Sequence, residues 1–562
     1  MIPPDKRLFR ALAFLLLCAC STAPQQKPGY DILITGALVL DGTGAPGIYA
    51  DVAVKGGKIA AVGQLSRADA AAVIDARGLA VAPGIIDIHS HSDYALLVDG
   101  GAESKIRQGV TTEIIGEATS AGPFRPEESD HGRIESPTCG VEIDWAALGE
   151  YFDRLKTSGT SVNVGSYVGS MTVRRFVMGD TNRPASAGEI ERMAAAVEQA
   201  MREGALGVAT ALLGSPLTTG ELIAMARAAG RHGGLYSTHI RDEGDRIFEA
   251  LDEAFLVGRE AGVPVDVLHL KIADRKLWGQ MGRVLARFEQ ARAEGVQATA
   301  NMYPYIAGQN DLASLVPPSG WNGGRQAMLE RLRDPAQRAE FRRILYAGGL
   351  PGWYNHYTAS AGWESMLIVS TRAEKNRSLA GMTMDRVIAG RGAAEPTDVL
   401  YDLLLEEDGS VPTIFFLMTE EDVRTAMASP LVSFGSDGAA VKPGGVLGRG
   451  KPHPRWYGTF PRILGKYVRE EKVLPLETAI LKMTWMNAQK IGLRDRGLVQ
   501  AGMAADLFLF DPGRIADRAT FSDPHQFPAG VEYVLVNGTV VLERGEHTGR
   551  KPGVILYGPG RR

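Results

Sequence analysis

The sequence predicts a parallel α/β barrel of eight strands, joined to a small β domain that is assembled from both ends of the chain. Three observations lead to this prediction. Short apolar runs alternate with helical patterns through the middle of the chain, as in parallel α/β folds. Eight such runs occur, which is the number in a closed (β/α)8 barrel. Both ends of the chain, by contrast, are rich in strands and turns.

The candidate barrel strands are short and apolar, and helical stretches such as 189–202 and 248–260 lie between them. They cover residues 85–89, 111–116, 162–165, 206–210, 235–239, 265–269, 297–302 and 431–436. In a barrel of this kind, functional residues lie at the carboxyl ends of the strands. We therefore expect the polar residues that follow these runs to meet on one face.

The small β domain is predicted from residues 30–80 and 500–562, as a β-sandwich with one part from each end of the chain. In the first part, Gly56-Gly57 makes a tight turn between two strand-like runs. In the second part, Asn537-Gly538 stands between apolar strands, which is a strong signal for a hairpin.

Residues 81–499 are predicted to form the barrel. The gap between its seventh and eighth strands is long and holds charged, helical stretches. We interpret residues 308–400 as an inserted lid or wall over the barrel mouth. Surface helices without a functional role are the alternative.

The first 20 residues have the pattern of a secretory signal, because basic residues precede an apolar run at 11–17. Residues 17–20 resemble a bacterial lipobox, in which Cys20 is the lipidated residue. Ser21 after it favours the outer membrane, and residues 21–29 form a polar tether. We expect an exported lipoprotein on the periplasmic side of the outer membrane, which contacts the membrane only through its lipid anchor.

The composition is that of a soluble globular chain. The 562 residues are 22% charged and 45% hydrophobic, and the formal net charge is -4. Nothing in this balance indicates a nucleic-acid surface. The chain has only 3 cysteines, so any metal site must come mainly from His, Asp and Glu.

The His89-Ser90-His91 run is the strongest sign of function, since it ends the first apolar strand. Two imidazoles at i and i+2 of an extended strand point to one side and can bind one divalent ion. His239 and His269 end the fifth and sixth strands, and Asp437 follows the eighth. Four histidines on three strand ends, with a late aspartate, predict a zinc site of one or two ions.

Two carboxylates have predicted roles at this site. Glu117 follows the second strand, where it can supply a hard oxygen ligand between two ions. Glu113 lies earlier in the strand and is the less favoured choice. Asp437 is predicted to be a ligand and also the catalytic residue, which takes a proton from water and later returns it.

The chain resembles the N-acyl-D-amino-acid deacylase (D-aminoacylase) family of the amidohydrolase superfamily. The resemblance covers residues 30–557 and rests on the runs 84–93, 108–112, 238–244, 269–271, 303–305, 436–438 and 453–462, with the tail 511–553. It implies a barrel with a small β-sandwich, and hydrolysis of a linear amide to a carboxylic acid and a D-amino acid. The implied partner is a small N-acyl amino acid or a short peptide.

Two departures from related sequences concern the metal. Many superfamily members carry a carboxylated lysine at the end of strand four, whereas residues 207–210 contain no lysine. Many D-aminoacylases have Gly-Asn-Cys-Gly after strand two, where the cysteine binds zinc. This chain has Gly116-Glu117-Ala118-Thr119 instead. Glu117 is therefore the expected bridging ligand.

The resemblance also implies that Lys271, Tyr303 and Arg455 contact the substrate. A guanidinium binds a carboxylate through two parallel hydrogen bonds, so Arg455 is the first choice for the α-carboxylate of an N-acyl amino acid. Arg241 is a further candidate. His453 is expected behind the ligands rather than among them.

Three other functions are compatible with parts of this pattern. A dipeptidase that acts on peptides with a C-terminal D-residue is close to a deacylase, because a peptide is also an N-acyl amino acid. A cyclic amidase of the dihydropyrimidinase type is disfavoured by the missing lysine. A non-catalytic binding module is disfavoured by the complete set of histidines and Asp437.

Overall fold

The computed structural model describes Met1 and residues 29–125, 140–350 and 352–561. The predicted secretory signal, Cys20 and nearly all of the predicted tether lie outside these residues. Within the described part of the chain, no helix is both long enough and apolar enough to cross a membrane.

Eight parallel strands form the barrel that the sequence predicts. Each strand pairs in parallel with the next one around the ring. A parallel bridge between Ser90 and Gly438 closes the ring. The strands are β6 (Ile85–Asp87), β7 (Val110–Ile115), β8 continued by β9 (Asn163–Ser166 and Val168–Gly169), β10 (Gly207–Ala211), β11 (Leu235–His239), β12 (Val265–Val267), β13 (Ala298–Met302) and β17 (Val432–Phe434). The eight-stranded barrel is thus confirmed.

Helices follow the barrel strands and cover them, and their caps explain where they begin. Ser186 and Thr218 each accept a hydrogen bond from the backbone of the glutamate three residues later, which in turn bonds back, so both helices start with a capping box. The principal helices around the barrel are α3 (Leu148–Ser158), α4 (Ser170–Met178), α5 (Ala187–Glu203), α6 (Thr219–Gly230), α7 (Ile247–Ala261), α8 (Met281–Ala293), α14 (Glu420–Ala428), α15 (Arg455–Arg462), α16 (Leu476–Met483) and α17 (Trp485–Lys490).

Strands from both ends of the chain form one nine-stranded sheet. In its second half, Asn537 and Gly538 connect β19 to β20 with φ angles of 48° and 76°, which fits the tight hairpin turn that this dipeptide predicts. The strands are β1 (Tyr30–Val39), β2 (Ile48–Lys55), β3 (Lys58–Gly63), β4 (Ala70–Asp75), β5 (Ala80–Pro83), β18 (Leu507–Phe510), β19 (Val531–Val536), β20 (Thr539–Glu543) and β21 (Glu546–His547). β5 pairs with β18, so the two ends of the chain share one sheet.

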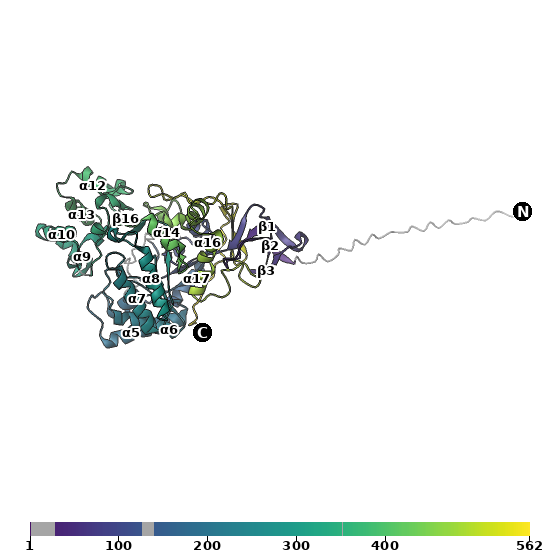
Figure 1. The fold of residues 1–562 in the computed structure, drawn as a ribbon, viewed down its shortest axis with the longest axis horizontal. Helices are drawn as coiled ribbons and strands as arrows, with labels where there is room; N and C mark the ends of the chain where they lie inside the picture. Colours follow the sequence, from purple (N-terminus) through teal and green to yellow (C-terminus); the bar gives the residue numbers. More distant parts are fainter. Residues whose placement is uncertain (2–28, 126–139, 351, 562) are drawn as a thin grey trace.

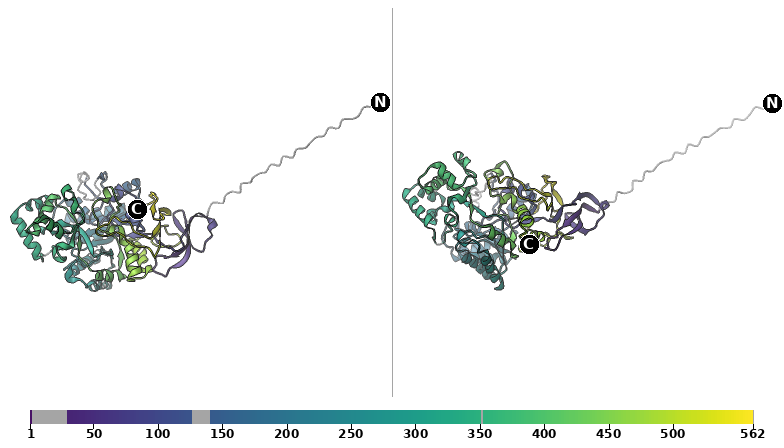
Figure 2. Two further views of the ribbon diagram at one scale, coloured as in Figure 1. Left: turned by 90° about the horizontal axis from the view of Figure 1, so that it is seen from above. Right: turned by 45° about the horizontal axis from the view of Figure 1, so that its top comes forward.

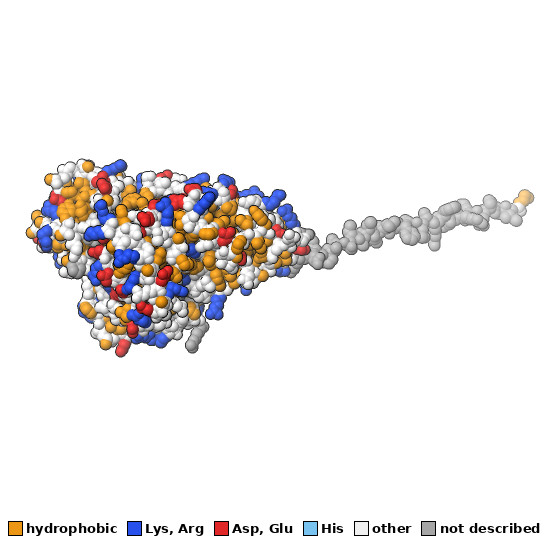
Figure 3. Space-filling model, viewed as in Figure 1, with side chains coloured by type: hydrophobic (Ala, Val, Ile, Leu, Met, Phe, Trp, Pro, Cys, Tyr) orange, Lys and Arg blue, Asp and Glu red, His pale blue; other side chains and the backbone are white. Residues whose placement is uncertain are grey.

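A separate layer lies between β13 and β17. It has its own apolar core, which includes Leu315, Phe341 and Tyr401. Its elements are β14 (Ala307–Asp311), β15 (Met366–Ile368), β16 (Pro412–Phe416), α9 (Gly324–Arg331), α10 (Pro335–Ala347), α11 (His356–Ala359), α12 (Met384–Arg391) and α13 (Pro396–Glu406). In Figures 1 and 2 this layer and the terminal sheet lie at opposite ends of the molecule. Basic and acidic side chains are mixed over the face in Figure 3.

A buried polar contact fixes the terminal sheet to the barrel. Asp506 lies just before β18 and is 3% exposed. Its carboxylate accepts hydrogen bonds from Asn163 Nδ2 at 3.0 Å and from the Asn537 backbone at 2.7 Å, and it pairs with Arg496. Asn163 belongs to β8, so one carboxylate joins a barrel strand, a sheet strand and a hairpin turn.

A buried lysine holds three neighbouring barrel strands together. Lys490 Nζ donates to Asp266 Oδ1 at 2.6 Å, to the Ala300 carbonyl at 2.7 Å and to Ser433 Oγ at 2.7 Å. Asp266 Oδ2 also accepts from Asn301 Nδ2 at 2.8 Å. Because these partners lie on β12, β13 and β17, the lysine fixes the strands that lead to His269 and Asp437.

We predict that Lys490→Met destabilises the protein, because it leaves the Asp266 carboxylate buried without its cation. Loss of one partner of a buried pair costs about 3–5 kcal/mol. Thermal denaturation at one fixed scan rate measures the effect. The double variant Lys490→Met/Asp266→Asn removes the uncompensated charge and should recover part of the loss. An unchanged midpoint in Lys490→Met would contradict this role.

Candidate metal centre

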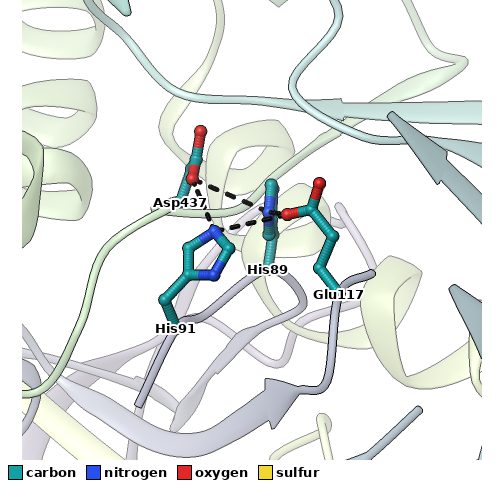
Figure 4. Close-up of side chains that lie close together, drawn as sticks. All are labelled: His89, His91, Glu117 and Asp437. Atoms are coloured by element: carbon teal, nitrogen blue, oxygen red, sulfur yellow. Dashed lines mark hydrogen bonds and ion pairs between the residues drawn. The ribbon is translucent and has the colours of Figure 1, made fainter. Parts of the chain in front are cut away.

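Four predicted ligands meet at the carboxyl ends of the first, second and eighth barrel strands (Figure 4). His91 Nε2 lies 3.0 Å from Asp437 Oδ1 and 3.3 Å from Glu117 Oε2. His89 Nε2 lies 3.7 Å from Asp437 Oδ1 and contacts Glu117 Oε2 directly. The side chain of His91 is 44% exposed, so this group opens to solvent on that side.

Glu117 also belongs to a second group of possible ligands, with His239 and His269. Its two oxygens face different groups. Oε2 faces the histidines that follow β6, and Oε1 lies 3.6 Å from His239 Nδ1, at the end of β11. A carboxylate placed in this way can share its oxygens between two ions.

The pKa values of both carboxylates of the centre are lowered. Burial favours the neutral form of Glu117, but the neighbouring His89 and hydrogen bonds from the other rings outweigh it, and they hold its pKa well below the usual range. Burial likewise works against the charge of Asp437, while Arg455 and His89 hold its pKa well below the usual range. The centre therefore contains two buried negative charges that a divalent cation can neutralise.

The residues present fit a zinc centre. Imidazole nitrogens and carboxylate oxygens are ordinary zinc ligands. His239 Nε2 is buried without a hydrogen-bond partner, so the ring is not fully satisfied by the protein alone. His269 and Asp437 have φ angles of 36° and 50°, in the left-handed region that non-glycine residues seldom occupy. Such strain is typical of functional sites.

A buried lysine holds the first and last barrel strands together beneath these ligands. Lys105 Nζ donates to Asp87 Oδ2 at 2.7 Å, to Ser436 Oγ at 2.9 Å and to the Gly438 carbonyl at 2.8 Å. Asp87 in turn accepts from the Ser436 backbone at 2.8 Å. Since Asp87 precedes His89 by two residues, and Ser436 and Gly438 flank Asp437, the lysine sets where these ligands lie.

Glu113 completes this buried group and does not lie among the ligands. Its Oε2 accepts from Ser90 Oγ at 2.5 Å and from Ser92 Oγ, and it lies 3.6 Å from Lys105 Nζ. Burial raises its pKa. Glu113 therefore supports the histidine segment from below, while Glu117, four residues later, reaches the ligand groups.

Three of the predicted substrate-binding residues lie close together, and one of them, Arg455, contacts Asp437. Arg455 Nη1 is 3.1 Å from Asp437 Oδ2, and its guanidinium lies 4.5 Å from the centre of the Tyr303 ring. Lys271 Nζ lies 5.7 Å from the same ring. Tyr303 Oη and Arg455 Nε are buried without a partner. This wall therefore presents donors that remain available to a carboxylate.

The structure does not bring Arg241 into this group. Its guanidinium donates to both oxygens of Glu253, at 2.8 and 2.9 Å, and to the carbonyls of Ser215 and Leu217. His453 accepts a hydrogen bond from the Arg455 backbone at 3.0 Å and lies close to the Ala307 carbonyl. It therefore supports the first residue of α15.

Two residues at the centre were missed by the sequence analysis. Lys105 lies in a short polar helix, and nothing in its neighbourhood indicates that it is buried. Glu243 lies four residues after His239 in a run that we quoted, and it contacts Lys271 Nζ at 2.5 Å and His269 Nδ1 at 3.0 Å. Its position four residues after a predicted ligand could have indicated that Glu243 lies near the metal centre.

Comparison with protein families supports this interpretation of the site. Residues 72–542 match the model of the amidohydrolase family. The chain belongs to the amidohydrolase family. A D-aminoacylase of Alcaligenes xylosoxydans xylosoxydans is 35% identical over 530 residues, which is 94% of this chain and 97% of that protein. An N-acyl-D-aspartate deacylase of the same organism is 34% identical, over 95% of this chain and 96% of that protein.

Solved structures agree with the sequence comparison. A D-aminoacylase crystal structure has a TM-score of 0.78 at 36% identity, over 94% of this chain and 100% of that chain. An N-acyl-D-glutamate deacylase of Bordetella bronchiseptica, complexed with zinc and a phosphonate inhibitor, has a TM-score of 0.77 at 29% identity, over 94% and 99% of the two chains. The amidohydrolase barrel with a separate sheet domain is thus shown.

We predict that Lys105→Met both destabilises the protein and lowers its zinc content. The variant leaves Asp87 buried without its cation, at a cost of about 3–5 kcal/mol, and it releases the turn that carries Asp437. Thermal denaturation and metal analysis of the purified protein measure the two effects.

Lys482→Met is the matched control for this variant. Lys482 is also buried, but it donates only to the carbonyls of Met427 and Ser429, and burial lowers its pKa to about 7. Its replacement leaves no buried carboxylate without a cation, so zinc content should not change. Equal losses of zinc in both variants would contradict a specific role for Lys105.

Proposed function

We propose that this chain is a metal-dependent hydrolase that cleaves the amide bond of N-acyl-D-amino acids to a carboxylate and a free D-amino acid. One observation carries the proposal: Glu117 faces two ligand groups, and Asp437 stands beside them next to a wall of donors. Three relatives that align with this chain over nearly their whole length support the substrate class. They are named as a D-aminoacylase and as deacylases of N-acyl-D-aspartate and N-acyl-D-glutamate.

Zinc fits the ligand set and would be held by the histidines at three strand ends and by two carboxylates. When bound, zinc supplies a water of lowered pKa and polarises the amide carbonyl. The proposed ligands are His89, His91, Glu117, His239, His269 and Asp437. The relative of known structure that was complexed with zinc supports this choice of metal.

Asp437 is the proposed catalytic residue. Its pKa is held well below the usual range, so it is a carboxylate at neutral pH. It takes a proton from the attacking water and gives it to the leaving amide nitrogen, as a general base and then a general acid. Arg455, at 3.1 Å, orients one of its oxygens and leaves the other facing His91.

The donors beside Asp437 are proposed to hold the α-carboxylate of the substrate. Arg455 has a buried Nε without a partner, and Tyr303 has a buried Oη without a partner. Lys271 lies on the same side. A carboxylate bound there would be close to the base, which places the adjacent amide next to Asp437. Arg241, whose guanidinium is used by Glu253, is the least supported of the predicted contacts.

A linear amide is favoured over a cyclic one. An L-hydantoinase from Arthrobacter aurescens shares the fold with a TM-score of 0.52, but the two chains are only 17% identical. A dipeptide with a C-terminal D-residue presents the same amide and the same α-carboxylate, so it remains the second candidate substrate.

Two proposals rest on the sequence. The layer between β13 and β17, within which we predict a lid at 308–400, is proposed to cover the barrel mouth and to select the substrate side chain. The N-terminal pattern supports export and lipid attachment at Cys20, and thus a place on the periplasmic side of the outer membrane. Loss of radiolabelled lipid incorporation in Cys20→Ser would test the second proposal.

We predict that zinc-loaded protein hydrolyses N-acetyl-D-amino acids and that Asp437→Asn lowers kcat by about 10²–10⁴-fold, the usual contribution of a general base. Release of free amine measures the rate, and the L-enantiomers and L-Xaa-D-Xaa dipeptides are compared side by side. Asp245 is an exposed aspartate on the same face of the barrel. The control variant Asp245→Asn should therefore keep full activity.

The outcomes separate the candidate substrates. Faster turnover of dipeptides than of N-acetyl-D-amino acids would favour the dipeptidase. No turnover of either by zinc-loaded protein would overturn the proposal and direct the search to cyclic amides. Removal of the metal by a chelator should abolish activity, and added zinc should restore it.

A further inference from the structure

Asn301 is a fully buried asparagine on β13 whose side chain reaches the backbone of His269. Its Oδ1 accepts a hydrogen bond from the His269 backbone N–H at 3.0 Å, and its Nδ2 donates to Asp266 Oδ2 at 2.8 Å. The carboxylate of Asp266, which pairs with Lys490, can only accept. It therefore turns the amide nitrogen of Asn301 toward itself and leaves the amide oxygen facing His269.

The backbone of the same asparagine holds the other side of His269. The Asn301 carbonyl accepts a hydrogen bond from the Leu270 backbone N–H at 2.8 Å. The peptide groups before and after the Cα atom of His269 are therefore both bonded to one residue. Because φ and ψ describe the rotation of these two planar groups about Cα, Asn301 defines both angles of His269.

The conformation held in this way is one that histidine seldom adopts. The φ angle of His269 is 36°, in the left-handed region, and such a residue persists only where its surroundings fix it. In a more common conformation, at least one of the two peptide groups would rotate away from Asn301. The imidazole would then leave its place beside Glu117 and His239, with which it forms the second ligand group.

We propose that Asn301 is a positioning residue that holds His269 in its left-handed conformation before a metal binds, and so raises the zinc affinity of the second ligand group. This inference rests on the metal centre of the proposed function, in which His269 is a ligand. A ligand that is already in place loses less conformational freedom on binding, and this strengthens the binding. Asp266 acts one step further away, because it anchors the amide of Asn301.

The first test measures the zinc dissociation constant of the purified full chain by competition with a chromophoric chelator. Asn301→Leu keeps the shape of the side chain but removes the acceptor for the His269 N–H, so we expect zinc affinity to fall by about 10–100-fold, as is usual when a residue that orients a ligand is lost.

Thr299→Val is the matched control. Thr299 lies on the same strand and donates to the same carboxylate, at 2.8 Å from Asp266 Oδ1. Its hydroxyl bonds go to Asp266 and to the Val265 carbonyl instead of to His269. The control variant should lower the thermal midpoint and leave the zinc affinity unchanged.

The pair of variants separates positioning from general support of the barrel. Both variants remove one hydrogen bond from Asp266, but only Asn301→Leu releases the backbone of His269. Equal losses of zinc affinity in the two variants would show that the effect passes through Asp266 alone, and would overturn the proposal. Unchanged affinity in Asn301→Leu would also overturn it, whereas a wild-type chain that binds no zinc would overturn the proposed function itself.

A second measurement needs no variant. Hydrogen exchange of the His269 backbone amide, followed by mass spectrometry at single-residue resolution, reports whether its bond to Asn301 persists. We expect slow exchange in the metal-free wild-type chain as well as in the zinc-loaded one, because Asn301 holds the backbone before the metal binds. Fast exchange that becomes slow only when zinc is added would overturn the proposal, even if Asn301→Leu failed to fold.

Discussion

The buried contact of Lys105 with Asp87 and the Ser436–Gly438 turn is the constraint on which the site depends. It is completely enclosed, and it joins residues that lie about 350 positions apart in the chain, for example Asp87 and Ser436 with a separation of 349. Apolar packing is not directional, so it would not by itself define the register between the first and last strands of the barrel. A charged group with directed partners does so, because any slip would leave Asp87 or the lysine buried and unpaired, at a cost of several kcal/mol. The histidine pair and Asp437 therefore meet in one place.

The remaining proposed ligands lie at the ends of other barrel strands. Glu117 follows β7 and turns its two oxygens to different ligand groups, while His239 and His269 approach from β11 and β12. Lys490 contacts Asp266 on β12 and Ser433 on β17, and so fixes the strands that lead to His269 and Asp437. The strain at these two residues, whose φ angles are positive, is thus supported by directed contacts on either side. Lys105 with Asp87 and Lys490 with Asp266 thus fix the strands whose carboxyl ends carry the proposed ligands.

The sequence predicts the barrel well because each strand is a short apolar run with a clear boundary, and because active residues of barrels follow the strands. All eight strands were found, and the predicted ligands meet at their carboxyl ends. The buried supports were not predictable in the same way. Lys105 lies in a polar stretch whose pattern predicts an exposed helix. Its partners Ser436 and Gly438 are distant in the chain. Arg241 follows His239 by two residues, but it points to Glu253 on α7, a contact that strand periodicity does not reveal. Glu243 is close in sequence to a ligand, yet only the fold brings it to His269.

Anomalous diffraction from zinc-saturated crystals would show directly whether Glu117 is shared between the two proposed ligand groups. We expect two zinc peaks, one on each side of the Glu117 carboxylate. One peak should be bound by His89, His91 and Asp437, and the other by His239 and His269. A single peak that Glu117 does not touch, or zinc bound away from these side chains, would contradict a shared role for Glu117.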